Sequence, residues 1–140
     1  MIVLDTNVLS ELMRPVPEPC VVDWLDAQET ATVAITAITV AEILYGIERL
    51  PDGRRKRSLM ASSAAMFDED FAGRILAFDG EAAMRYAERV AASEQAGRAV
   101  QMADAQIAAI CLRHEATLAS RNVKDFIGLD VPLINPWEQG

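Results

Sequence analysis

The sequence predicts an α/β fold in which a mostly parallel sheet of about five short strands lies between layers of helices. Two observations carry this prediction. Short runs that are apolar throughout alternate along the chain with longer segments of helical periodicity, which is the pattern of βα units. Strands that are apolar throughout are buried on both faces, as the strands of parallel sheets are.

The first half of the chain supplies two of the expected strands, at residues 2–4 and 33–35. A helix over residues 7–13 follows the first strand and ends before Pro15, because proline cannot continue a helix. A second short helix is expected at 20–28. After the second strand, Thr39 and Glu42 have the Thr-x-x-Glu spacing of a capping box, so a helix is expected from Thr39 to about Leu50.

The second half repeats the alternation after the turn at 51–53. Helical segments are expected at 55–67, from Asp79 through Val90, and from Asp104 to about His114. Strands are expected at 74–78, 117–119 and 132–134. Gly97 separates the last two helices, since glycine in a helix interior is unfavourable.

Length and composition indicate a single domain over residues 1–140, because the chain is 51% hydrophobic and carries no linker or repeat. The start lacks the basic and apolar regions of a secretory signal, and no apolar run has the length of a membrane span. Cys20 and Cys111 have no metal-ligand spacing. A cytoplasmic protein without a membrane segment is therefore expected.

The net charge of −8 excludes a broad basic surface of the usual nucleic-acid-binding kind. One concentrated positive segment remains, and it includes Arg54 and Arg55. Such a short run is most simply a solvated helix start. Its functional interpretation is a local rim that contacts phosphates.

Polar residues at four places follow a strand or open a helix, namely Asp5, Glu42, Asp104 and Asn122. In a parallel sheet the carboxyl ends of strands and the starts of the next helices share one edge, where ligands bind. Carboxylate and amide oxygens gathered there would suit Mg²⁺ or Mn²⁺.

Each of these residues also has a structural explanation. Asp5 could cap the helix that follows it, and Glu42 could simply complete the capping box. Asp104 lies on one helical stripe with Ala108 and Cys111, so its carboxylate shares the core-facing side and needs a cap or a cation. Two carboxylates about 4 Å apart repel by roughly 4 kcal/mol at an effective dielectric near 20, so a convergent group favours a divalent ion.

Four motifs in this order resemble the PIN-domain proteins, and among them the VapC-type toxins of bacterial type II toxin–antitoxin systems, including the FitB-like branch. The motifs are IVLDTN at residues 2–7, AITVAEILYG at 37–46, ADAQIAA at 103–109 and ASRNVKDF at 119–126. The resemblance covers essentially the whole chain. It implies a three-layer α/β/α PIN-like domain and a Mg²⁺- or Mn²⁺-dependent endoribonuclease.

The resemblance also implies roles for particular residues. Asp5, Glu42 and Asp104 carry over as the carboxylates of the metal site, with Thr6 as the small hydroxyl beside the first of them. The fourth family position is often Asp but is Asn122 here, which orients a water or a phosphate in this interpretation, whereas Asp125 could supply the fourth carboxylate. RNA contact is expected near Arg54, Arg55 or Arg121.

The partners that the resemblance implies are an RNA substrate, a cognate antitoxin and a second copy of the chain, with DNA bound only through the antitoxin. The alternative is a catalytically weak PIN-fold partner acting in an autorepressing antitoxin–DNA complex, and Asn122 keeps it open. A haloacid-dehalogenase-type phosphatase would require an acid where Asn7 stands, and the paired acids of a receiver domain are also missing.

Overall fold

The computed structural model describes residues 1–139 and shows a sheet of five parallel strands. The strands are β1 (Ile2–Leu4), β2 (Val33–Thr36), β3 (Ile75–Leu76), β4 (Thr117–Ala119) and β5 (Leu133–Ile134). Their order across the sheet is β3-β2-β1-β4-β5, and every neighbouring pair runs parallel. The expected parallel sheet of about five strands is thereby confirmed.

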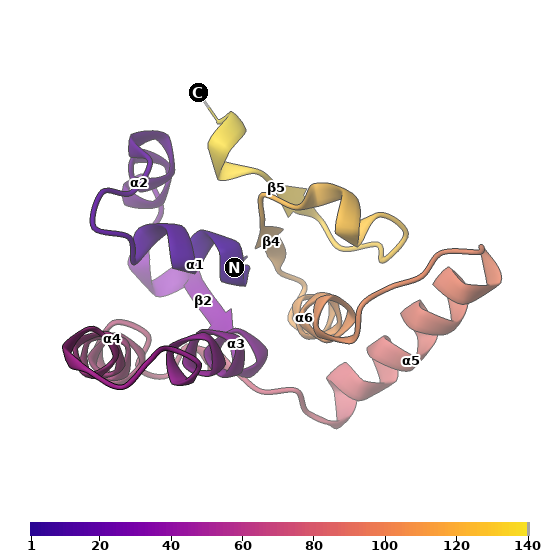
Figure 1. Ribbon diagram of the computed structural model, residues 1–140. Helices are drawn as coiled ribbons and strands as arrows, with labels where there is room; N and C mark the ends of the chain where they lie inside the picture. The colour runs from indigo at the N-terminus through magenta and orange to yellow at the C-terminus, as the bar shows by residue number, and fades with distance from the viewer. Residues whose placement is uncertain (140) are drawn as a thin grey trace.

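Six α-helices connect and cover the strands (Figure 1). They are α1 (Thr6–Leu12), α2 (Pro19–Asp26), α3 (Ala37–Glu48), α4 (Arg54–Ala65), α5 (Gly80–Gln95) and α6 (Met102–Arg113). Shorter helical turns are η1 (Thr30–Thr32), the π-helical turn η2 (Met66–Asp70), η3 (Val123–Phe126) and η4 (Pro136–Glu138). Within residues 1–139, no helix is long and apolar enough to cross a membrane.

Side chains alternate across the central strands and divide the core into two clusters. Leu4 and Ile35 point into one cluster with residues of α1, α2 and α3, whereas Val3 and Leu118 point into the other with residues of α6. All four side chains are fully buried. Because successive residues of a strand face opposite sides, these apolar strands need helices on both faces.

The two clusters define the layers of the domain. Helices α1, α2 and α3 cover one face, α6 covers the other, and α5 packs on the outside of α6 (Figure 1). This arrangement confirms the predicted three-layer α/β/α fold.

The predicted capping box in the third helix is wrong. Helix α3 begins at Ala37, and its N-cap is Thr36, whose hydroxyl accepts a hydrogen bond from the Thr39 amide at 3.1 Å. Thr36 at the strand end offers the same capping chemistry three residues earlier. Glu42 therefore lies in the helix interior, where its carboxylate is free for another partner.

Other boundaries differ by a few residues. The predicted strand 74–78 pairs only at Ile75 and Leu76, and helix α6 begins at Met102 instead of at Asp104. Asp104 does not cap this helix, because the N-cap is Gln101 and it makes no side-chain capping bond. Asp79 does cap its helix, through a bond from the Ala82 amide.

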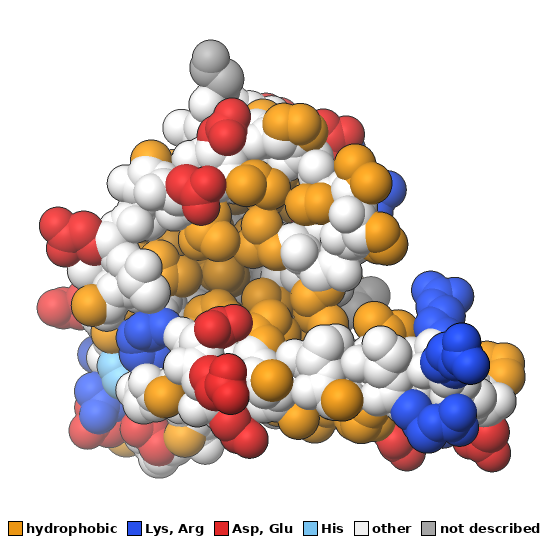
Figure 2. Space-filling view, turned by 90° about the vertical axis from the view of Figure 1, so that its left-hand side faces the viewer, with side chains coloured by type: hydrophobic (Ala, Val, Ile, Leu, Met, Phe, Trp, Pro, Cys, Tyr) orange, Lys and Arg blue, Asp and Glu red, His pale blue; other side chains and the backbone are white. Residues whose placement is uncertain are grey.

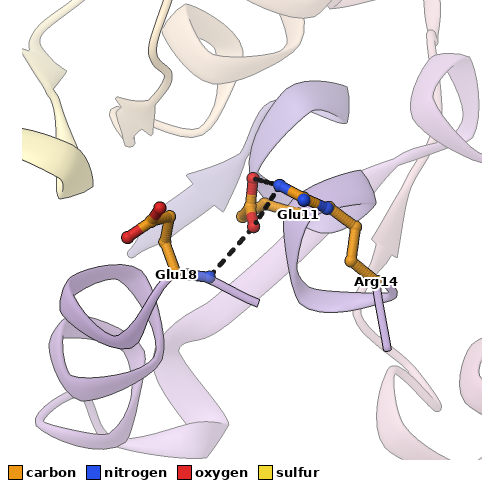
Figure 3. A network of polar contacts seen from close by, with 3 residues as sticks. All are labelled: Glu11, Arg14 and Glu18. Atoms are coloured by element: carbon orange, nitrogen blue, oxygen red, sulfur yellow. Dashed lines mark hydrogen bonds and ion pairs between the residues drawn. The ribbon is translucent and has the colours of Figure 1, made fainter. Parts of the chain in front are cut away.

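A buried carboxylate fixes the turn between α1 and α2 (Figure 3). Glu11, only 7% exposed, accepts hydrogen bonds from the Glu18 amide at 3.0 Å and from the Arg14 guanidinium at 3.1 Å. The bond from the Glu18 amide, followed by the contact with Arg14, lowers the pKa of Glu11. The proline-rich turn at 15–19 therefore has a defined path beside α1.

Candidate active site

The order in which the chain adds strands to the sheet changes direction at β1. From β1 it moves to β2 and β3 on one side, and then returns to β4 and β5 on the other. In open α/β sheets, such a switch point leaves a crevice outside the carboxyl ends of the strands, where ligands bind. Asp5 follows β1 at this position, and Ser120 follows β4.

Asp5 is 4% exposed and uses both of its carboxylate oxygens. Its Oδ1 accepts a hydrogen bond from the Thr6 amide at 2.9 Å, and its Oδ2 accepts bonds from Ser120 Oγ at 2.7 Å and Asn7 Nδ2 at 3.2 Å. Burial nevertheless raises the pKa of Asp5, although the three hydrogen bonds oppose the rise. Asp5 thus caps α1 and also holds a partly compensated charge at the switch point.

The hydroxyl of Ser120 has only one orientation that satisfies its partners. Its oxygen accepts hydrogen bonds from the Asn122 amide at 3.0 Å and from Asn7 Nδ2 at 3.2 Å. Both partners can only donate, so the single hydroxyl proton points to Asp5. Sequence analysis missed this role of Ser120 because a serine after a strand has no distinctive pattern.

A hydrogen bond from Thr6 connects Glu42 to the residues around Asp5. The Thr6 hydroxyl donates to Glu42 Oε1 at 2.6 Å, and it lies 3.0 Å from the hydroxyl of buried Thr39. Since Thr6 gives its proton to a carboxylate, it accepts the proton of Thr39. This hydrogen bond links the Glu42 side chain to the first residue of α1, and the supporting role of Thr6 in a metal site stays a prediction.

Replacing Thr6 by valine is expected to release Glu42 while the volume of the site stays nearly constant. Valine lacks the donor, so the 2.6 Å bond to Glu42 is lost, whereas Thr6→Ser keeps it. A reduction of about 10- to 100-fold in the catalysis proposed below is expected for Thr6→Val, which is the usual cost of losing an orienting partner. Turnover measurements on both variants test this. An equal loss of turnover in Thr6→Val and Thr6→Ser would show that the Thr6 hydroxyl does not orient Glu42.

Asp104 lies in the first turn of α6, one turn before Ala108 and two turns before Cys111, both of which are fully buried. Partial burial, followed by the charges of Asp5, Asp125 and Glu42, raises the pKa of Asp104 to about 6. The carboxylates of Asp5, Asp125 and Glu42 therefore lie near enough to Asp104 to disfavour its charged form. Glu42 and Asp104 line separate hollows, so the assignment of Asp5, Glu42 and Asp104 to one metal site stays a prediction.

Asp104→Asn is expected to stabilise the protein, and the gain should depend on pH. The pKa of Asp104 is raised in the folded state, so its ionisation costs stability as pH rises from about 4 to about 6, and the full cost remains above 6. Thermal unfolding in EDTA should therefore show a higher midpoint for the variant at pH 8 and a clearly smaller increase at pH 4.5.

The matched control for this experiment is Asp23→Asn. Asp23 is exposed on α2, and its carboxylate makes no ion pair within residues 1–139. Its substitution should leave the midpoint unchanged at both pH values. A gain from Asp104→Asn that is independent of pH would contradict the assignment of the effect to ionisation.

Two side chains are candidates for the fourth position of the site, the amide of Asn122 and the carboxylate of Asp125. Asn122 and Asp125 line the same hollow of about 880 Å³ as Asp104. Both are exposed, and Asp125 raises the pKa of Asp104. Among the residues described, no three Asp, Glu, His or Cys side chains already form a metal-binding arrangement. The donors that converge are nevertheless carboxylate oxygens, which suit a hard divalent cation.

The three arginines with predicted RNA contacts lie in different surroundings. Arg55 lines a hollow together with Thr6 and Glu42, and Arg54 is exposed on the first turn of α4. The Arg121 guanidinium lies 5.0 Å from the centre of the Trp137 ring, which gives it a structural partner. Arg55 is thus the one of these three that lines a hollow with a site carboxylate, that of Glu42.

The fold and the site define an α/β/α protein with a carboxylate cluster at the switch point of a parallel sheet. The chain belongs to the PIN domain family, whose profile matches residues 2–130. The family resemblance noted in the four sequence motifs is thereby confirmed.

Three relatives align over nearly their full lengths. Plasmid stability protein StbB of Pseudomonas syringae pv. tomato is 45% identical, and VapC ribonuclease Y4jK of Sinorhizobium fredii is 38% identical, each with 99% of both chains covered. Toxin FitB of Neisseria gonorrhoeae is 41% identical, with 98% of this chain and 99% of FitB covered.

The solved structure of FitAB bound to an IR36 DNA fragment contains a chain of the same fold. It superposes with a TM-score of 0.93 at 40% identity and covers 100% of this chain and 98% of that one.

Proposed function

We propose that this protein is a metal-dependent endoribonuclease that serves as the toxin of a type II toxin–antitoxin module. The observation that carries the proposal is that Asp5, Asp125 and Glu42 lie near enough to Asp104 for their charges to add to the rise in its pKa that burial produces. Such a cluster of acids is costly without a cation. The names of the relatives support the reaction, because Y4jK is a ribonuclease and FitB is a toxin.

In the proposed site, Asp5, Asp104 and Glu42 hold Mg²⁺ or Mn²⁺, and Asn122 or Asp125 completes the set. The bound cation would supply a Lewis acid that polarises the phosphate and lowers the pKa of an attacking water. Ser120 and Asn7 keep the carboxylate of Asp5 oriented, and Thr6 does the same for Glu42. Asn122, which is exposed beside Asp104, is positioned to donate its amide to a phosphate or water.

The proposed partners follow from the similar complexes. FitAB binds DNA as a complex, so we propose that this chain binds a cognate antitoxin and reaches DNA through it. We also propose that it forms a homodimer, as its resemblance to the VapC-type toxins implies, and that it acts in the cytoplasm. Figure 2 shows an apolar hollow on the face of the domain that carries α2 and α4. Leu9, Leu12, Leu25, Met66 and Phe71 line a cavity between α1, α2 and η2. We place an apolar segment of the antitoxin there.

The test of this function is cleavage of several structured and single-stranded RNAs by antitoxin-free protein. Cleavage is expected with Mg²⁺ or Mn²⁺, should stop in EDTA and should return when the metal is restored. Adding the cognate antitoxin should inhibit it. Absence of metal-dependent cleavage, together with operator binding in the presence of the antitoxin, would favour the catalytically weak DNA-complex partner instead.

A further inference from the structure

Two separate hollows contain residues of the proposed site. One contains Thr6 and Glu42 and is bordered by Arg55. The other, here called the α6-side hollow, is lined by residues before and within α6 and by the loop after β4. Its polar lining residues include Arg98, Gln101, Asp104, Asn122, Lys124 and Asp125. An RNA strand bound at Asp104 would therefore pass Arg98 and Lys124.

Neither cation of the α6-side hollow is neutralised by a neighbouring carboxylate. Across residues 1–139, the ion pairs use Arg14, Lys56, Arg89 and Arg113, and neither Arg98 nor Lys124 forms one. Both side chains are exposed. In a chain of net charge −8, two unpaired cations beside a cluster of acids supply local attraction for an anionic ligand.

The backbone of the loop leaves room for Arg98. Gly128 has a φ of +89°, a conformation that favours glycine, and a Cβ added there would lie 2.7 Å from Nη1 of Arg98. The guanidinium therefore packs directly against the loop that carries Lys124 and Asp125. Arg98 therefore lies against the same loop that carries Lys124, and both side chains line one hollow.

We propose that Arg98 and Lys124 bind RNA phosphates adjacent to the cleaved one, on the α6 side of the carboxylates. Arg98 and Lys124 line the same hollow as Asp104. They therefore place cationic contacts beside the carboxylates, which would otherwise repel the charge of RNA. Exposed guanidinium and ammonium groups are the donors that phosphates bind. The sequence analysis, guided by the dense run at 54–57, overlooked both residues because they are isolated in the sequence. This inference rests on the proposed ribonuclease function.

The experiment measures binding of a short fluorescent single-stranded RNA to the full chain in EDTA, by anisotropy, between about 50 and 200 mM salt. Arg98→Gln and Lys124→Gln should each reduce the slope of log affinity against log salt by about 0.7, and the double variant by about 1.4. Arg85→Gln is the matched control, because Arg85 is exposed on α5 in a separate hollow beside Asp130. The Arg85→Gln variant should show the same slope of log affinity against log salt as the unmodified protein.

RNA cleavage measured on the same proteins separates the proposed phosphate contacts from the proposed ribonuclease function. If RNA is cleaved but the slopes of the Arg98 and Lys124 variants equal that of the Arg85 control, the phosphate contacts are wrong and the ribonuclease function stands. If the slopes fall as expected but no protein cleaves RNA, Arg98 and Lys124 do bind RNA phosphates, but the ribonuclease function fails, and with it their placement beside a cleaved phosphate. Absence of RNA binding by the unmodified protein would overturn this inference.

Discussion

Asp5→Asn is expected to remove RNA cleavage, with a loss greater than the roughly 100-fold that the loss of an orienting partner costs. The substitution removes the charge at the centre of the switch point but retains the size of the side chain. An amide also presents two donors where the carboxylate only accepts, so it opposes at least one of the donors from Thr6, Asn7 and Ser120. Initial rates at saturating Mg²⁺ measure the effect.

The fold should survive this substitution. Burial raises the pKa of Asp5, which means that the folded state destabilises its charged form. Removing the charge therefore offsets part of the lost hydrogen bonding. Circular dichroism and thermal unfolding should be close to those of the unmodified protein, and the exposed Asp23→Asn variant should cleave normally. Cleavage by Asp5→Asn at the unmodified rate would disprove the assigned role of Asp5.

Phe126→Ala is expected to reduce the free energy of unfolding by about 3–5 kcal/mol, the range for truncating a buried aromatic side chain. Phe126 is 2% exposed and belongs to the cluster that joins α6 to the sheet. It also ends η3, the turn that carries Lys124 and Asp125. Its loss leaves a cavity directly beneath that side of the proposed site.

Chemical denaturation measures this change, and the adjacent Ile127→Ala is its control. Ile127 is 54% exposed, so its truncation should change the free energy by no more than about 0.5 kcal/mol. Phe126→Ala should also weaken RNA binding at temperatures well below its unfolding midpoint, because η3 loses its anchor. Similar stability for the two variants would show that Phe126 is not a principal support of this loop.

Much of the fold follows from apolar patterning, because the pattern is local. All five strands were predicted, and the alternation of Val3 and Leu4 between two clusters explains why they are apolar on both faces. The start of the third helix was misplaced, since Thr36 and Thr39 are both good capping residues. Thr36 is the N-cap because strand β2 ends at this residue.

The candidate site was only partly accessible from the sequence. The acids Asp5, Glu42 and Asp104 stand out because they interrupt apolar segments at the ends of elements. Ser120 does not stand out, because its importance comes from contacts with Asp5 and Asn7 that are more than a hundred residues away. Contacts of that kind depend on how the strands are ordered, which local patterns do not specify.

The central place of β1 has a consequence for synthesis on the ribosome. Its neighbours β2 and β4 contribute residues from 33 and from 117 onward, and the bond between Asp5 and Ser120 spans 115 positions. A parallel sheet with such distant pairings forms late and slowly. The nascent chain therefore cannot complete the Asp5 centre until most of it has been translated. If the protein is the proposed ribonuclease, an emerging polypeptide cannot cleave nearby RNA until that point.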